Sequence, residues 1–237
     1  MRNLIKADLK RIMGKPGLYV AVVLMLLLIL IPRAAASASE QMESYKSLFN
    51  VFGLTIVCIP IYLSVYTDEL RSGTMITAIG MGLPRHKMVK AKLWVSTILL
   101  LGSYLLLYLA AVLKDAASGL VVTPRQNLFL LIYCLFCVIR GVGIFALSSL
   151  VLFLSMSAAG GMLVLVLAGM ASSPLLKGAQ QETKFPFYDM SFMGLLDSAY
   201  ADFQAGGFGG SLVPALIYLG IVIFINVKVF NRKELNL

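Results

Sequence analysis

The chain has 237 residues, of which 59% are hydrophobic and only 13% are charged, and its formal net charge is +9. Soluble domains are nearer about 45–50% apolar and roughly 25% charged, and a soluble domain of this size could not hide so much apolar surface. The composition therefore excludes an ordinary soluble protein and indicates an integral membrane protein. Because no linker-like segment divides the chain, we predict an all-α fold with a single transmembrane domain over residues 1–237.

The first 15 residues predict an amphipathic helix that lies along the membrane surface. Apolar side chains recur with a helical period from Leu4 to Ile12, and Lys and Arg residues fall between them. Such a basic polar face suits the headgroup region of a bilayer. We expect the Lys-Pro-Gly sequence at residues 15–17 to end this helix and turn the chain into the membrane.

Apolar stretches long enough to cross a bilayer, about 20 residues each, follow in six places. They cover residues 18–32, 48–66, 93–113, 127–154, 158–174 and 212–230. We predict a tight turn at residues 155–157, where no charge marks the boundary. Because Ala36-Ser37-Ala38 follows the first stretch, a cleaved signal peptide remains an alternative to the first span.

The distribution of Lys and Arg predicts the orientation of the chain. The N-terminal segment, the loop at residues 67–92 and the C-terminal tail hold 13 of these residues, against 6 in the segments on the other side. Positive residues favour the cytoplasmic side, so we expect both termini to be cytoplasmic, which six spans allow. The net positive charge thus reflects topology, and we expect no nucleic-acid partner because no basic patch is interleaved with exposed aromatics.

The loop at residues 67–92 carries the most informative pattern. Asp68 and Glu69 stand where the second span ends, Gly73 permits a sharp bend, and Thr74 could cap a short helix that Gly82 and Pro84 would end. These features favour a short cytoplasmic helix held between two spans, able to transmit the movement of a soluble partner. An ordinary basic loop is the alternative.

The loop resembles that of the ABC-2 type permeases, the membrane subunits of certain ATP-binding-cassette transporters. The shared pattern consists of an acidic residue, then Gly-Thr, then Pro-Arg, and then Lys before the next span. In this sequence the residues that match the pattern are Glu69, Gly73, Thr74, Pro84, Arg85, Lys90 and Lys92. Asp68 and Arg71 stand beside them in the same loop. The N-terminal helix is similar to the elbow helix of that family, and the six spans match its topology. The compact size resembles the small bacterial permeases that export antimicrobial peptides or phenol-soluble modulins.

The resemblance implies that the loop is a coupling helix that docks on a separate ATPase subunit. The chain has no G-x-x-x-x-G-K-[ST] phosphate loop of its own, so we expect no enzymatic activity here and no cofactor, with ATP and Mg²⁺ bound by the partner. The resemblance also implies a second permease half, identical or different, and a bacterial plasma membrane. The substrate would be amphipathic or hydrophobic, such as a peptide.

The segment at residues 175–210 is the longest one expected outside the membrane. It is rich in aromatic residues, including Phe185, Phe187 and Tyr188, and two Gly-Gly pairs precede the last span. Related permeases have short re-entrant helices here. One interpretation is an extracellular gate with glycine hinges, and the other is an aromatic belt at the outer interface.

Arg140 lies in the middle of the fourth predicted span, where a charge is costly unless it faces the bundle interior or a wet cavity. It could contact an acidic or polar part of a substrate. Alternatively it could hydrogen-bond helix-end carbonyls or hydroxyls, or lie near an interface if Gly141 and Gly143 break the helix.

The sequence offers little for catalysis or metal binding. Cys134 and Cys137 form a C-x-x-C pair on an apolar stretch, but zinc normally takes four ligands and the single histidine, His86, lies in the basic loop. We therefore expect packing roles for the cysteines and no metal site. A secondary transporter, a membrane-embedded enzyme and a non-transporting scaffold or sensor are the remaining alternatives to an exporter subunit.

Overall fold

The structure is a computed structural model that describes residues 2–31, 37–119, 122–207 and 209–232. Every regular element within these ranges is a helix, which confirms the all-α prediction. Pro32, at the end of the first predicted span, and Ala36, in the alternative signal-peptide site, lie outside the described residues.

The first half of the chain contains two helices, then one long composite helix, then a short helix and a long one. The first two are α1 (Arg2–Met13) and α2 (Pro16–Leu30). The composite helix consists of α3 (Ala38–Phe52), η1 (Gly53–Cys58), α4 (Ile59–Tyr62), η2 (Leu63–Thr67) and α5 (Asp68–Arg71), of which η1 and η2 are π-helical. The short α6 (Thr74–Gly80) leads into α7 (Arg85–Ser118).

The second half begins with a long helix and ends with another, and shorter elements lie between them. The elements are α8 (Pro124–Ser155), α9 (Ala158–Val166), the π-helical η3 (Leu167–Ala171), α10 (Ser172–Thr183), α11 (Phe187–Met190), α12 (Phe192–Gln204) and α13 (Leu212–Arg232). α9, η3 and α10 follow one another without a break.

Five helical segments of the described residues are long and apolar enough to cross a membrane, and a sixth is formed if a bent pair counts as one span. The five are Ala38–Arg71, Arg85–Ser118, Pro124–Ser155, Ala158–Thr183 and Leu212–Asn231. The bent pair joins Asn3–Met13 to Pro16–Leu30 at an angle of 67°. Five of the six predicted spans fall within these segments, and several helices extend well beyond them. The first prediction, residues 18–32, overlaps the second helix of the bent pair, which ends at Leu30. Hydropathy detects only the apolar part of a helix, whereas the backbone hydrogen bonds continue into polar sequence.

The helix boundaries follow from local chemistry. Met156 ends α8 in the left-handed conformation (φ 52°), and the hydroxyl of Ser157 accepts a hydrogen bond from the backbone of Gly160 at the start of α9, so the turn predicted at residues 155–157 is confirmed. By contrast, α8 continues without a break through Gly141 and Gly143. These two glycines leave room on the helix surface for the side chain of Leu100 and the ring of Phe192. The predicted alternative of a helix broken beside Arg140 is therefore wrong.

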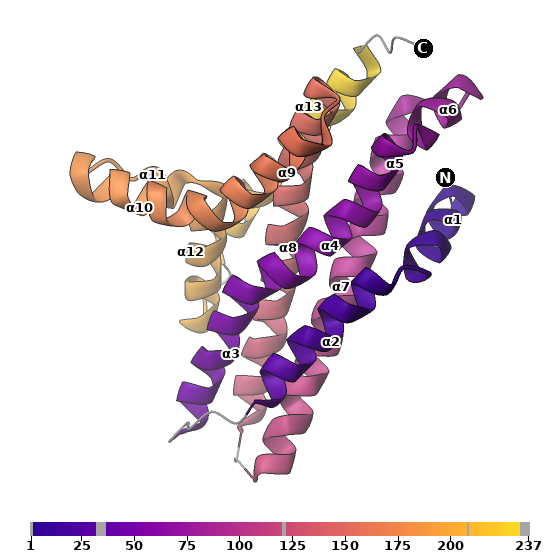
Figure 1. The fold of residues 1–237 in the computed structure, drawn as a ribbon. Coiled ribbons are helices and arrows are strands. Elements are labelled where there is room, and N and C mark those ends of the chain that lie inside the picture. Colours follow the sequence, from indigo (N-terminus) through magenta and orange to yellow (C-terminus); the bar gives the residue numbers. More distant parts are fainter. Residues whose placement is uncertain (1, 32–36, 120–121, 208, 233–237) are drawn as a thin grey trace.

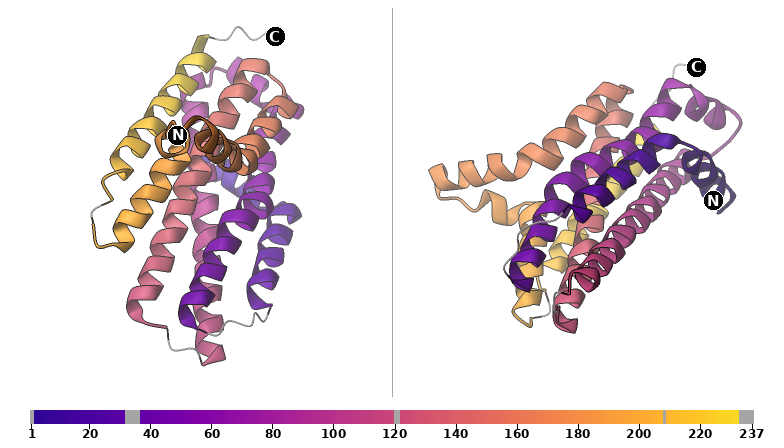
Figure 2. Two further views of the ribbon diagram at one scale, coloured as in Figure 1. Left: turned by 90° about the vertical axis from the view of Figure 1, so that its left-hand side faces the viewer. Right: turned by 60° about the horizontal axis from the view of Figure 1, so that its bottom comes forward.

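α7 and α8 pack against each other at the centre of the bundle, and α13 packs against both (Figure 1). α2 lies on α7, and α3 lies on α8. Asn226 of α13 donates hydrogen bonds to the carbonyl of Ala146 (2.8 Å) and the hydroxyl of Ser149 (2.7 Å), the kind of polar contact that joins helices in lipid. The α10–α11 hairpin projects sideways as an arm, as Figure 1 and the right-hand view of Figure 2 show.

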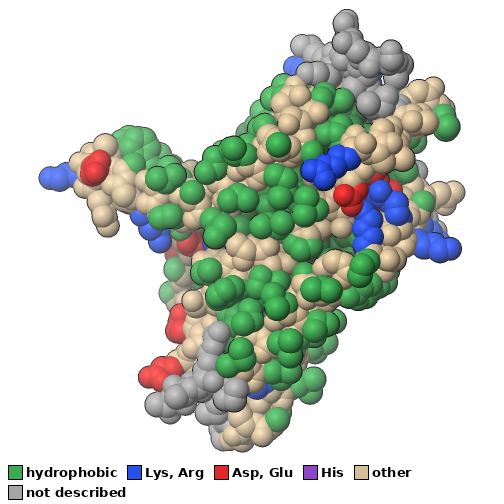
Figure 3. All heavy atoms as spheres, in the orientation of Figure 1, with side chains coloured by type: hydrophobic (Ala, Val, Ile, Leu, Met, Phe, Trp, Pro, Cys, Tyr) green, Lys and Arg blue, Asp and Glu red, His purple; other side chains and the backbone are tan. Residues whose placement is uncertain are grey.

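The surface of the bundle is apolar over its middle. Figure 3 shows hydrophobic side chains across most of the visible face, with charged side chains gathered near α1 and α5 and at the arm. Leu27, Leu109 and Phe224, from three different helices, are each at least half exposed. Lipid would cover such a surface without cost.

Candidate functional site

A cluster of four charged side chains joins α1, α5 and α7. The ammonium of Lys92 donates to Asp8 Oδ2 (2.6 Å) and to Glu69 Oε1, and Glu69 also accepts from the guanidinium of Arg11. Lys92 is only 2% exposed, and both carboxylates are buried. Next to this cluster, Lys15 pairs with Asp68 at a more exposed position. We call Asp8, Arg11, Glu69 and Lys92 the ion-pair cluster.

The ion-pair cluster carries no net charge, since two cations face two carboxylates. Removing one partner from a buried pair strands the other and costs about 3–5 kcal/mol, although the intact pair adds little net stability. The cluster therefore acts less as a source of stability than as a specific clamp. It holds α1 and the end of the composite helix to one point on α7.

The predicted loop residues divide into buried and exposed groups. Glu69 is buried in the ion-pair cluster, so it reaches a soluble partner only through its neighbours, whereas Arg71 is exposed. Gly73 adopts the left-handed conformation predicted for a sharp bend (φ 68°). Pro84 immediately precedes α7, and Arg85 donates to the last carbonyls of α13, at Phe230 (3.5 Å) and Asn231 (3.4 Å).

The short helix predicted in the loop is present as α6, but its capping differs from the prediction. Gly73 is the N-cap residue, and it has no side chain to cap the helix. Thr74 is the first helical residue, and its hydroxyl instead lies 3.0 Å from the hydroxyl of Ser72 and 3.5 Å from the carbonyl of Glu69. The predicted capping role of Thr74 is thus wrong, because the bend at Gly73 moves the helix start back by one residue. α6 exposes Met81 at its end, with 82% of that residue accessible.

Arg140 is buried inside the bundle, and its two terminal nitrogens bond protein groups from two other helices. Its guanidinium donates to the amide oxygen of Asn50 on α3 and to Asp197 Oδ1 on α12. Tyr188 donates its hydroxyl to the second oxygen of Asp197. The internal-contact alternative for Arg140 is therefore confirmed in kind, but its partners are an amide and a carboxylate rather than helix-end carbonyls or hydroxyls.

Burial raises the pKa of Tyr188 to about 12, and its hydrogen bond to the Asp197 carboxylate adds to this shift. Tyr188 therefore stays protonated and donates at any physiological pH. The three residues expected to form an extracellular gate differ in their burial. Tyr188 is held inside, whereas Phe185 and Phe187 are exposed and pack on each other with ring centroids 4.7 Å apart.

One face of the composite helix lines three adjoining cavities. The residues involved repeat every three or four positions, which places them on one side of the helix, and they are Ser39, Met42, Glu43, Lys46, Ser47, Asn50, Val51 and Leu54. The cavities measure about 180, 450 and 220 Å³ in order along the helix. The first two share Glu43, Lys46 and Gln204, and the last two share Asn50. We call this succession of cavities the α3 groove.

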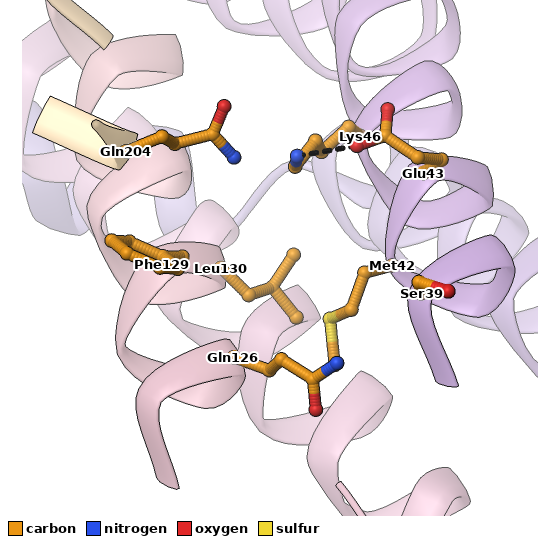
Figure 4. Close-up of a pocket in the computed structure, with 8 residues that line it drawn as sticks. All are labelled: Ser39, Met42, Glu43, Lys46, Gln126, Phe129, Leu130 and Gln204. Carbon is orange, nitrogen blue, oxygen red and sulfur yellow. Dashed lines mark hydrogen bonds and ion pairs between the residues drawn. The ribbon is translucent and has the colours of Figure 1, made fainter. Parts of the chain in front are cut away.

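The first cavity of the α3 groove lies between α3, α8 and α12 (Figure 4). Met42, Phe129 and Leu130 give it apolar walls, while Lys46 and Gln204 reach toward each other across it. The largest, middle cavity is more polar and is lined by Tyr133, Asp197 and Tyr200 in addition to residues of α3. The third cavity has Arg140 on its wall beside Gly169 and Met193. The groove is thus amphipathic along its length.

The cysteines all lie in the packed interior. Cys58, Cys134 and Cys137 are free and buried. In the part of the chain that the structure describes, no group of three or more His, Cys, Asp or Glu side chains is arranged to hold a metal ion.

The sequence predictions missed the partners that complete both charged sites. Asp8 and Arg11 lie on one face of α1 by their spacing, a signal that could have indicated a common contact. Similarly, Glu43, Lys46 and Asn50 recur at helical spacing at the start of an otherwise apolar helix. No local pattern identified Asp197 as the partner of Arg140, because the two are brought together only by the fold.

The composite helix thus carries the ion-pair cluster near its C-terminal end and the amphipathic α3 groove along its N-terminal half. Comparison of the chain with protein-family models, with curated proteins and with solved structures found no match.

Proposed function

We propose that the chain is the transmembrane subunit of an exporter driven by a separate ATPase. The observation that carries this proposal is the ion-pair cluster, which joins the exposed α5–α6 turn to the long helices that would cross the membrane. A partner that pushed on α6 would move Glu69, and Glu69 is tied to α1 and α7. A loose surface loop would dissipate the same push.

In this proposal α1 serves as an elbow helix and α6 as a coupling helix, as in the ABC-2 permeases that the sequence resembles. The partner ATPase would bind ATP and Mg²⁺, and a second permease half would complete the pore. Both terminal helices end toward the same end of the bundle (Figure 1). That arrangement and the positive residues there support cytoplasmic termini in a bacterial plasma membrane. The groove supports an amphipathic or hydrophobic substrate.

The test is a mild-detergent purification of the chain from its native membrane, with mass spectrometry of the proteins that accompany it. We expect a stoichiometric soluble protein that contains a phosphate loop. Met81→Glu should release that partner, because it places a charge on the exposed apolar residue that caps the end of α6. Met190→Glu is the matched control, since Met190 is also exposed but belongs to the arm. Recovery of the chain without an ATPase, under conditions that preserve such complexes, would refute the proposal.

One observation favours a second candidate function, a proton-coupled secondary transporter. Asp115, near the end of α7, is buried, and its Oδ1 accepts from the hydroxyl of Tyr45 (2.7 Å), which in turn accepts from the amide of Gln41 (2.8 Å). Its other oxygen is buried and has no hydrogen-bond partner among the described residues. Buried acids within spans mark proton pathways in many transporters. If an imposed pH gradient drove transport that Asp115→Asn abolished, this function would replace the first.

A further inference from the structure

The middle cavity of the α3 groove contains a site suited to an organic cation. Lys46 extends from α3 so that its ammonium lies 2.6 Å from Glu43 Oε1 and 5.3 Å from the centre of the Tyr200 ring. A carboxylate on one side and an aromatic face on the other form the environment that binds ammonium and guanidinium groups. We call Glu43 and Tyr200 the cation cage.

The ring of Tyr200 is fixed in place by its neighbours. It packs edge-on against Tyr133 (5.0 Å between centroids) and Phe136 (5.7 Å), and its hydroxyl donates to the carbonyl of Phe129 (3.3 Å). Tyr133 is in turn bonded to the carbonyl of Lys46 (3.3 Å). The aromatic wall of the cage is therefore rigid before any ligand arrives, which reduces the entropy lost on binding.

Among the described residues, the ammonium of Lys46 is held by Glu43 and Tyr200, groups that another cation could use. Its side chain is 14% exposed, whereas that of Glu43 is 72% exposed, so one side of the pair faces open space. An exposed ion pair of this kind contributes little, about 0–1 kcal/mol. A ligand that brought its own ammonium could thus displace Lys46 at small cost, and Lys46 could swing away on its flexible stem.

The other charges along the groove do not favour an anion. Arg140 is buried, and its guanidinium is already paired with Asp197 and Asn50. Lys46 is the one cation among the residues that line the middle cavity, and it is already paired with Glu43. An anionic headgroup would meet the Glu43 and Asp197 carboxylates, which would repel it.

The cavities on either side of the cage can hold an apolar chain. Met42, Phe129 and Leu130 line one side, and Val51, Leu54 and Met170 line the other. The first and last lining residues of the composite helix, Ser39 and Leu54, stand 15 residues apart, or roughly 22 Å at a helical rise of about 1.5 Å per residue. The groove therefore offers a charged centre with apolar room beside it.

We propose that the α3 groove binds an amphipathic cation, with its ammonium or guanidinium group in the cation cage and its apolar chain in an adjoining cavity. Lys46 occupies the cage when no ligand is present and leaves it when one binds. This inference rests on the proposed function in treating the ligand as the transported substrate. The binding itself requires neither ATP nor a partner subunit.

The test measures binding to the purified full chain in nanodiscs of zwitterionic lipid. The probe is a fluorescent dodecyltrimethylammonium, and its uptake by empty nanodiscs is subtracted. Probes with the same chain but a sulfonate or a neutral polar headgroup test the dependence on charge. We expect saturable binding of the cationic probe and much weaker binding of the other two.

Lys46→Gln should tighten binding of the cationic probe by about three- to tenfold, because it removes the internal competitor. Glu43→Gln should weaken it several-fold, and since Glu43 is largely exposed the variant should fold. Lys177→Gln is the matched control. Its ammonium also lies over a tyrosine, 4.5 Å from the ring centre of Tyr188, but outside the groove, so binding should not change.

Three results would overturn the inference: no saturable binding, equal or tighter binding of the sulfonate or neutral probe, or weaker or unchanged binding to Lys46→Gln. None of these results depends on whether an ATPase accompanies the chain. A cation-binding chain with no ATPase would therefore preserve the site and refute the exporter, and an ATPase complex with no cation binding would do the reverse.

Discussion

The ion-pair cluster leads to a sharp prediction for Lys92→Met. The substitution keeps the length and apolar stem of the side chain, but it strands Asp8, whose described ion-pair partner is Lys92, in a buried position. Glu69 retains Arg11. Breaking a buried pair from one side costs about 3–5 kcal/mol, which corresponds to a fall in Tm of about 6–20 °C for a chain of this size.

The assay is the fraction of detergent-solubilised chain that stays monodisperse after heating, followed by fluorescence-detected size-exclusion chromatography. Lys90→Met is the matched control, because Lys90 lies two residues earlier on α7 and is exposed. Its expected change is within about 0.5 kcal/mol. The double variant Asp8→Asn with Lys92→Met should recover a large part of the loss, since it leaves no stranded charge.

A fall in Tm for Lys92→Met no larger than that for Lys90→Met would refute this reasoning. It would mean that water or a neighbouring group compensates Asp8, and that the ion-pair cluster does not clamp the three helices. Failure of the double variant to recover would instead indicate that the loss comes from the missing bond between Lys92 and Glu69 rather than from a stranded Asp8.

Two further predictions concern the contact between α8 and the segment that follows α10. Gly143→Ala should destabilise the chain by about 1–3 kcal/mol, because the added methyl group overlaps the ring of Phe192; in the same heating assay Gly102→Ala, which enters open space on α7, should be neutral or slightly stabilising, and equal effects would contradict the packing. For Tyr188, the pKa of about 12 lies above the ordinary tyrosine value of 10.0, so the folded chain keeps a proton that the unfolded chain releases. Its contribution to stability should be complete below pH 10 and be lost as the pH rises to about 12. Ultraviolet absorbance of phenolate should show this late titration, and Asp197→Asn should shift it to lower pH; an unchanged midpoint in that variant would contradict the hydrogen bond.

Much of the architecture could be predicted because hydropathy and helix punctuation are local properties. The six apolar stretches, the break at residues 155–157 and the bend at Gly73 all depend on a few neighbouring residues. Helix lengths were harder. The span predicted at residues 48–66 belongs to a helix that begins at Ala38, because the polar first turns of α3 carry an N-cap at Ser37 and a helical period rather than hydrophobicity.

The sites were harder to predict because they depend on pairs that are distant in sequence. Arg140 was recognised as a buried charge, but its partner Asp197 lies 57 residues away. Asp197 lies on an element that sequence reasoning treated as an external aromatic segment. Likewise, the sequence predicted that Glu69 would face a soluble partner, but in the structure it is buried in the ion-pair cluster. Its partner Arg11 lies 58 residues away in the sequence. Local sequence predicts that a charge must be compensated, but only the fold determines by what.

The two sites share one helix, which leads to a last prediction about coupling. Glu43 of the cation cage and Glu69 of the ion-pair cluster stand 26 residues apart on the composite helix, roughly 39 Å at the rise of an α-helix. The helix between them contains Pro60 and the π-helical stretches η1 and η2. Such stretches often occur at functional sites and allow a helix to bend or change register.

We expect Glu69→Gln, which loosens the ion-pair cluster without touching the groove, to change the affinity of the cationic probe at least fivefold, within the usual range of coupling between sites. Asp68→Asn is the matched control, because it alters only the neighbouring and more exposed pair with Lys15, and it should change the affinity less than twofold. If both variants bound the probe as the unmodified chain does, the composite helix would be a static strut. The ion-pair cluster and the α3 groove would then be energetically independent of each other.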